Sequence, residues 1–159
     1  MIAINDNIER PDRRILQYVT VLMGDQLFGL PIERVQDVFL PERVTRVPLA
    51  APEIVGVLNL RGRVVTAVDL RLRLGLPAGP ADGQPMAVGI EWRGESYGLL
   101  VDTVGEVLKL PEDMIEPIPA NLDRQLAPVA TGIYRLEKGL LVILDVDRVL
   151  DDRNRSRAA

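Results

Sequence analysis

Apolar residues along the chain fall into short runs that are interrupted by charges, glycines and prolines. Short runs rich in β-branched and aromatic residues between turn-forming residues are typical of β-strands. Such runs occupy residues 18–23, 64–70, 86–92 and 140–146. Helix-like spacing covers only short stretches, residues 32–38, 70–74 and 145–150, none longer than about two turns. The pattern therefore predicts a mainly β protein with short helices.

One stretch of the pattern occurs twice. Residues 27–38 and 96–107 share an aromatic residue, Gly, Leu, Val, an acid and a second Val at an offset of 69, as from Phe28 to Tyr97. Further along, the offset becomes 76, as from Asp69 to Asp145. The repeat predicts two related lobes. Because near-closure of a small sheet limits exposed strand edges, we expect two five-stranded β-barrels packed on a shared core.

Composition suggests where the domain begins and ends. Residues 75–85 hold three Gly and three Pro, which predicts a loop between the two copies. Residues 1–14 mix acids and arginines without an apolar stretch, so we expect a disordered tail rather than a secretory signal. We expect a single domain over 15–150, with lobe 1 at roughly 24–75, lobe 2 at roughly 86–137, segments 15–23 and 138–150 completing the barrels, and a disordered tail at 151–159.

Composition also excludes several classes of function. No apolar run reaches the roughly 18 residues that a membrane span needs. The chain has neither Cys nor His, which removes the common zinc ligands, thiol chemistry and the usual general base near neutral pH. A net charge of −4 does not indicate a nucleic-acid surface. We therefore expect a cytoplasmic protein that binds other proteins, with no enzymatic activity, no catalytic residues, no cofactor and no metal.

Acidic residues recur at equivalent points of the two copies: Asp37 matches Glu106, and Asp69 matches Asp145. Two carboxylates that meet can perform acid–base catalysis. Equivalent points of separate lobes do not require the members of a pair to meet. We therefore interpret these acids as strand-end or turn-capping residues.

The clearest difference between the copies is Asn59-Leu60-Arg61-Gly62, because residues 135–138 of the second copy read Arg-Leu-Glu-Lys. Asn favours turns and Gly permits a positive φ, so Arg61 is expected to project from a tight connection. This segment is either a recognition turn or an ordinary hairpin in which Arg61 pairs with a nearby acid such as Asp69.

Charge is also unevenly distributed. Residues 43–73 hold six Arg and two acids, whereas residues 91–123 hold eight acids and two basic residues. Blocks of opposite sign steer a protein toward complementary surfaces and suit head-to-tail contacts. The alternative is a pair of ordinary solvated faces.

Four motifs of the chain occur together in one known family. They are FGLPI at 28–32, VTRVP at 44–48, GVLNLRG at 56–62 and VDLR at 68–71. In this combination the chain resembles the CheW-type coupling proteins of bacterial chemotaxis, over roughly residues 15–150. The resemblance implies two SH3-like barrels and a scaffold that links the cytoplasmic tips of methyl-accepting receptors to a CheA-type histidine kinase. It also implies a cytoplasmic location at the inner face of the membrane in receptor arrays, without membrane insertion or nucleic-acid binding.

The resemblance further implies which residues bind each partner. The receptor tip would contact Val35, Asp37, Gly56, Asn59 and Arg61. The kinase would contact Arg43, Thr45, Arg46 and Val47. A ring-closing contact would involve Asn121 and Leu122, where relatives often carry an aromatic residue. The alternative function is a small β-barrel module that binds nucleic acid or a small ligand.

Overall fold

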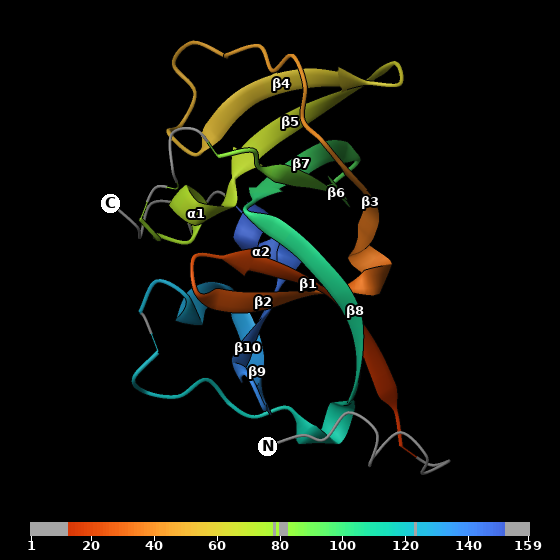
Figure 1. Cartoon of the computed structure of the whole chain (residues 1–159). Helices are drawn as coiled ribbons and strands as arrows, with labels where there is room; N and C mark the ends of the chain where they lie inside the picture. Colours follow the sequence, from red (N-terminus) through yellow and green to blue (C-terminus); the bar gives the residue numbers. More distant parts are fainter. Residues whose placement is uncertain (1–12, 78, 80–82, 123, 152–159) are drawn as a thin grey trace.

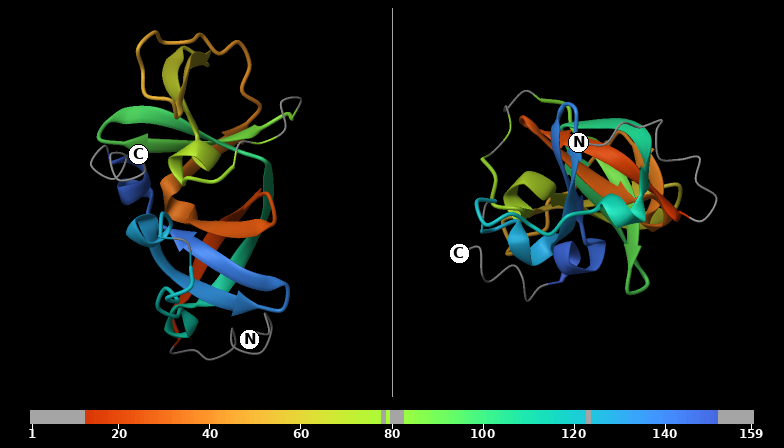
Figure 2. Two further views of the ribbon diagram at one scale, coloured as in Figure 1. Left: turned by 90° about the vertical axis from the view of Figure 1, so that its left-hand side faces the viewer. Right: turned by 90° about the horizontal axis from the view of Figure 1, so that it is seen from below.

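The structure, a computed structural model, describes residues 13–77, 79, 83–122 and 124–151. Two lobes lie one above the other, with two short α-helices at their junction (Figures 1 and 2). The strands are β1 (Ile15–Met23), β2 (Gln26–Pro31), β3 (Val35–Phe39), β4 (Ile54–Leu60), β5 (Arg63–Asp69), β6 (Met86–Trp92), β7 (Glu95–Val101), β8 (Thr103–Pro111), β9 (Ala130–Leu136) and β10 (Gly139–Leu144). The helices are α1 (Leu70–Arg73) and α2 (Val146–Leu150), with 3-10 turns η1 (Ile32–Arg34), η2 (Glu112–Met114) and η3 (Ala127–Val129).

Each lobe is built on one five-stranded sheet. The lower lobe of Figure 1 has the strand order β8-β1-β2-β10-β9, and the upper lobe has the order β3-β6-β7-β5-β4. A mainly β fold with two five-stranded lobes is therefore confirmed. In the range 32–38, where helix-like spacing was noted, only η1 is helical, because β3 begins at Val35 and pairs with β6.

The two copies of the repeat exchange strands. One copy supplies β1 to β5 and the other supplies β6 to β10, yet each sheet combines a hairpin of one copy with three strands of the other. The pairing register is the same in both lobes: Leu27 lies opposite Leu141, and at the repeat offsets Ser96 lies opposite Val65. The two lobes therefore have the same architecture, and each contains strands from both copies of the repeat.

This exchange corrects the predicted lobe boundaries. β2 falls in the range predicted for lobe 1 but lies in the lower sheet, and β6 and β7 fall in the range of lobe 2 but lie in the upper sheet. The strands of segments 15–23 and 138–150, β1 and β10, both lie in the lower sheet. The physical reason is the parallel pairing of β2 with β10 and of β7 with β5, which joins strands of different copies.

The predicted tails lie mostly outside the described residues. Of residues 1–14, the structure describes Arg13, whose Nε donates to Asp113 Oδ2 at 3.1 Å, and Arg14, whose carbonyl accepts from Glu112 N–H at 2.9 Å. These two residues are therefore fixed against the lower lobe.

One large apolar cluster joins the two lobes, and each lobe has a smaller cluster of its own. The joining cluster includes Phe28 and Leu30 from the lower sheet and Val88 and Leu99 from the upper sheet, all fully buried. Burying such a side chain contributes about 1.5–3 kcal/mol each. The expected shared core is therefore present, and it gives the two lobes one common interior.

Short helices begin at matching acids of the two copies. The Asp69 carboxylate accepts a hydrogen bond from Leu72 N–H at 3.3 Å, and the Asp145 carboxylate accepts one from Arg148 N–H at 3.2 Å. Such side chains satisfy N–H groups that the first helical turn leaves unpaired. The capping interpretation of Asp69 and Asp145 is confirmed.

Two ion pairs lie at the lobe junction, and the helix residue is basic in one (Arg71) and acidic in the other (Asp147). Arg71 of α1 donates to both carboxylate oxygens of Asp102, through Nε at 2.8 Å and through Nη2, and Gly24 N–H of the lower lobe donates to Asp102 at 2.9 Å. At the repeat-equivalent helix position, Asp147 of α2 pairs with Arg34 at 2.9 Å. Asp102 lies between β7 and β8, and Arg34 lies between β2 and β3, where the chain passes from one sheet to the other. Each ion pair therefore ties one of these connections to a short helix.

These contacts predict a specific acid sensitivity. Hydrogen bonds from Arg71, and more weakly from Gly24 N–H, lower the pKa of Asp102. A carboxyl with a lowered folded-state pKa adds stability above its unfolded pKa of about 3.9 and loses it as the pH falls through the folded pKa. We expect Arg71→Met to be less stable than the wild type at pH 7, with the difference shrinking in acid below about pH 4.

Urea unfolding at neutral and acidic pH measures this difference. The matched control is Arg14→Met, which removes an exposed pair with Glu112 at 3.5 Å and is expected to change stability little at any pH. A difference for Arg71→Met that stays constant from pH 7 to pH 3 would contradict the prediction.

Candidate functional site

Arg61 stands at the tip of the hairpin between β4 and β5. Leu60 pairs with Arg63, so the loop has two residues, Arg61 with φ 53° and Gly62 with φ 82°. Two positive φ values are typical of a type I′ hairpin turn. The Asn59 side chain accepts a hydrogen bond from Gly62 N–H at 2.8 Å, which further fixes the turn. The guanidinium of Arg61 is thus presented to solvent from a rigid base.

The alternative pairing of Arg61 with Asp69 is wrong. Asp69 lies at the far end of β5 and caps α1. Arg61 is exposed and makes no ion pair with any residue in the described part of the chain. Its charge is therefore available to a partner.

Asp37 is brought toward the same end of the upper lobe. Its strand, β3, is an edge strand that β6 and β7 separate from β5, yet Arg63 Nη2 of β5 approaches Asp37 Oδ2 to 4.0 Å. The other oxygen, Oδ1, is buried and has no hydrogen-bond partner among the described residues. A Cβ at Gly89 would stand 2.0 Å from that oxygen, so only glycine leaves room for this carboxylate. Val35, by contrast, is half-buried and packs against the shared core.

A strap, residues 40–53, crosses the outer edge of β4. Thr45 N–H donates to the Val57 carbonyl at 2.7 Å, and Val57 N–H donates to the Thr45 carbonyl at 2.8 Å. This pair satisfies backbone groups that an edge strand would otherwise leave open. The strap carries all four predicted kinase-binding residues, and their side chains are exposed: Arg43, Thr45, Arg46 and Val47.

Gly56 lies beneath this strap. A Cβ at this position would stand 2.2 Å from the Thr45 carbonyl oxygen and 2.8 Å from its carbonyl carbon. The second copy uses the same arrangement, because a Cβ at Gly132 would stand 2.8 Å from the Glu116 carbonyl oxygen. Gly56 is buried, and its lack of a side chain lets the strap approach β4.

One concavity joins residues predicted for different partners. It has a volume of about 480 Å³ and places Asn59 beside Arg43 and Thr45. Val64 also lines it and is 65% exposed although apolar. Asn59, predicted to touch the receptor, and two residues predicted to touch the kinase therefore share one surface.

The predicted ring-contact residues lie on the lower lobe. Leu122 N–H donates to the Pro119 carbonyl at 3.1 Å, forming a turn that leaves Asn121 exposed. The Leu122 side chain is half-buried and packs against the shared core. Asn121 alone therefore offers its full side chain to a partner, away from the strap.

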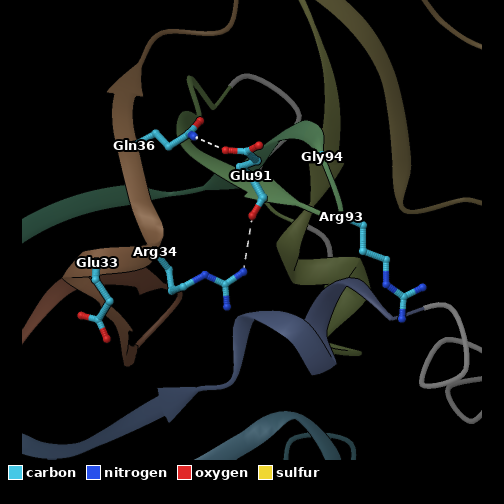
Figure 3. Close-up of a pocket in the computed structure, with 6 residues that line it drawn as sticks. All are labelled: Glu33, Arg34, Gln36, Glu91, Arg93 and Gly94. Carbon is cyan, nitrogen blue, oxygen red and sulfur yellow. Dashed lines mark hydrogen bonds between the residues drawn. The ribbon is translucent and has the colours of Figure 1, made fainter.

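A polar concavity of about 340 Å³ was not expected from the sequence (Figure 3). Its groups bind one another: Gln36 Nε2 donates to Glu91 at 3.1 Å, and Arg34 donates to the Glu91 carbonyl at 3.4 Å while also pairing with Asp147. The network joins β3, β6 and α2, so we interpret it as part of the lobe junction. One difference between the copies could have indicated this network: Arg34 of the first copy corresponds to the uncharged Thr103 of the second.

Within residues 13–77, 79, 83–122 and 124–151, no three metal-ligating side chains gather closely enough to hold an ion. In the same ranges, no helix has the length and apolar character needed to cross a membrane.

Comparison with known proteins gives a consistent result. The family model for the CheW-like domain matches residues 17–154. Chemotaxis protein CheW of Helicobacter pylori is 27% identical over 89% of this chain and 86% of its own length, and that of Bacillus subtilis is 29% identical over 88% and 90%. Protein PilI of Pseudomonas aeruginosa is 30% identical over 76% of this chain and 67% of its own length. The solved scaffolding protein TtCheW from Thermoanaerobacter tengcongensis superposes with a TM-score of 0.77 at 26% identity, covering 87% of this chain and 94% of that one.

Proposed function

Because this chain belongs to the CheW-like domain family, it is a chemotaxis coupling scaffold between receptors and CheA, and we propose that it binds both partners through its upper lobe without catalysing a reaction. The observation that carries the proposal is the rigid turn that presents Arg61, which makes no ion pair with the described residues. A scaffold needs such preformed surfaces rather than reactive side chains.

The receptor contact is proposed at the end of the upper lobe that carries the Arg61 turn. Asp37, Asn59 and Arg61 supply charged and polar groups there, and Arg63 links Asp37 toward the turn. A guanidinium offers several donors in a fixed fork, which suits carboxylates and carbonyls on a helical receptor tip. Gly56 and Val35 support this site from within, by strap placement and by core packing.

The kinase contact is proposed on the strap. Its exposed residues include two arginines, Arg43 and Arg46, within the arginine-rich range 43–73. Asn121 lies on the other lobe, so a ring-closing contact there would leave the strap accessible. We propose that the scaffold works in the cytoplasm, at the inner membrane face where receptor arrays assemble.

Calorimetry of the purified chain with the CheA-type kinase of the same cell tests this proposal. We expect micromolar or tighter binding that weakens at higher salt, since Arg43 and Arg46 belong to the range 43–73, which holds six Arg against two acids. The absence of binding at low salt would contradict the proposed partner and leave the fold unaffected.

An Arg61→Glu variant is expected to weaken receptor-dependent kinase control about tenfold, because it reverses an exposed charge at the proposed receptor contact. Its free energy of unfolding should change little, as the exposed side chain makes no ion pair within the part of the chain that the structure describes. Reconstituted receptor, kinase and scaffold provide the measurement, with kinase phosphorylation as the readout.

The matched control is Arg93→Glu. Arg93 and Gly94 form the same kind of turn between β6 and β7, with φ values of 51° and 78°, on the same sheet. The control should retain coupling. Equal coupling in the Arg61→Glu variant and the wild type would remove Arg61 from the site.

A further inference from the structure

Leu49 combines two unusual features at the tip of the strap. Its backbone is left-handed, with φ 64°, and its side chain is fully exposed at 106%. It follows Pro48 in a turn in which Ala50 N–H donates to the Val47 carbonyl at 3.4 Å. Glycine or asparagine is the ordinary residue at a left-handed turn position, because a side chain such as leucine is strained there.

Neither feature serves the fold. A fully exposed leucine buries no apolar surface, and its left-handed backbone opposes folding. The strap is held on both sides of the turn by backbone bonds, from Thr45 to Val57 and from Ile54 N–H to the Ala51 carbonyl at 2.9 Å. The second copy, which has the same kind of strap, carries Ala120 after Pro119 where this strap carries Leu49 after Pro48. The leucine is therefore specific to the upper lobe.

The surroundings of Leu49 indicate what would cover it. Val47, in the same turn, is also apolar and 42% exposed. Two exposed arginines, Arg43 and Arg46, precede it on the strap, whereas only one of the strap's two acids, Glu42, is exposed and Glu53 is buried. A complementary surface would therefore combine an apolar pocket with a rim of carboxylates.

We propose that Leu49 is a hydrophobic anchor that inserts into an apolar pocket bordered by carboxylates on the CheA-type kinase. The proposal rests on the proposed function and adds a residue that was not among the predicted contacts. A preformed turn lowers the cost of ordering the anchor on binding. Anchors of this kind contribute most of the affinity of an interface, while the neighbouring charges steer the approach.

Two substitutions separate anchoring from a structural role. Leu49→Gly removes the side chain and relieves the left-handed backbone, and Leu49→Asn keeps a side chain that tolerates this conformation. We expect both variants to have an unfolding midpoint equal to or higher than that of the wild type. We expect both to bind the full-length kinase about tenfold more weakly in calorimetry.

The control is Leu72→Gln, because Leu72 is another exposed leucine, at 41%, and lies on α1 with ordinary helical backbone. It should bind the kinase as the wild type does. If wild type and both Leu49 variants bind equally, the anchor is refuted while the proposed function stands. If the wild type itself does not bind the kinase, the proposed function fails and the assignment of this partner to Leu49 fails with it.

Discussion

A Gly56→Val variant is expected to lose about 3 kcal/mol of unfolding free energy and to lose kinase binding. The nearest atoms to an added Cβ are backbone atoms of Thr45, at 2.2 Å and 2.8 Å, and a backbone cannot move aside as a flexible side chain can. The strap must therefore shift outward, which breaks the two hydrogen bonds between Thr45 and Val57. The strap residues proposed to contact the kinase would then no longer be held in place against β4.

Gly132→Val is the matched control for this effect. It introduces the same kind of clash in the lower lobe, with the Glu116 carbonyl, and should destabilise the chain similarly. Because the upper strap is untouched, the folded fraction of this variant should bind the kinase normally. Urea unfolding and calorimetry on both variants make the comparison. Normal kinase binding by folded Gly56→Val would show that strap placement does not matter for that contact.

An Arg73→Met variant is expected to lose about 3 kcal/mol of unfolding free energy. Arg73 is 8% exposed, and its Nε and Nη2 donate to the carbonyls of Val149 and Asp151 at 2.6 Å and 2.7 Å. These carbonyls lie at the end of α2, where a helix leaves its last acceptors unpaired. Methionine keeps most of the side-chain volume and removes every donor, so the loss reports the hydrogen bonds rather than a cavity.

Urea unfolding measures this loss, with Arg124→Met as the control at an exposed arginine. The control should change stability by less than about 0.5 kcal/mol. A similar small change in Arg73→Met would mean that water replaces the two hydrogen bonds. The expected large change would identify Arg73 as a link between α1 of one copy and α2 of the other.

Much of the fold could be predicted from local pattern. The β-branched runs correspond to strands, the acids at Asp69 and Asp145 cap helices, and Asn59 with Gly62 forms a tight turn. Each of these depends on a few neighbouring residues, whose preferences are visible in any short window. The repeat was equally visible, because both copies form equivalent strands from similar residues at matching positions.

The candidate site was predictable only in part. The resemblance pointed to Gly56 as a receptor contact, and the structure adds that it lies under the strap, where its lack of a Cβ matters. Leu49 was not singled out, because its left-handed backbone and full exposure are not encoded in the residue type. The approach of Arg63 on β5 to Asp37 on β3 depends on the curvature of the sheet, because β6 and β7 lie between these two strands.

By itself, then, the sequence determined the β-rich class, the two repeated units, the turn around Arg61 and the membership of a family of scaffolds. The tertiary structure alone decided that the two copies exchange strands, that Arg71 and Arg73 hold the lobe junction, and that Gly56 positions the strap. The difference has a physical cause. Strand and turn preferences are local, whereas strand partners, close backbone approaches and buried hydrogen bonds arise between residues far apart in the chain.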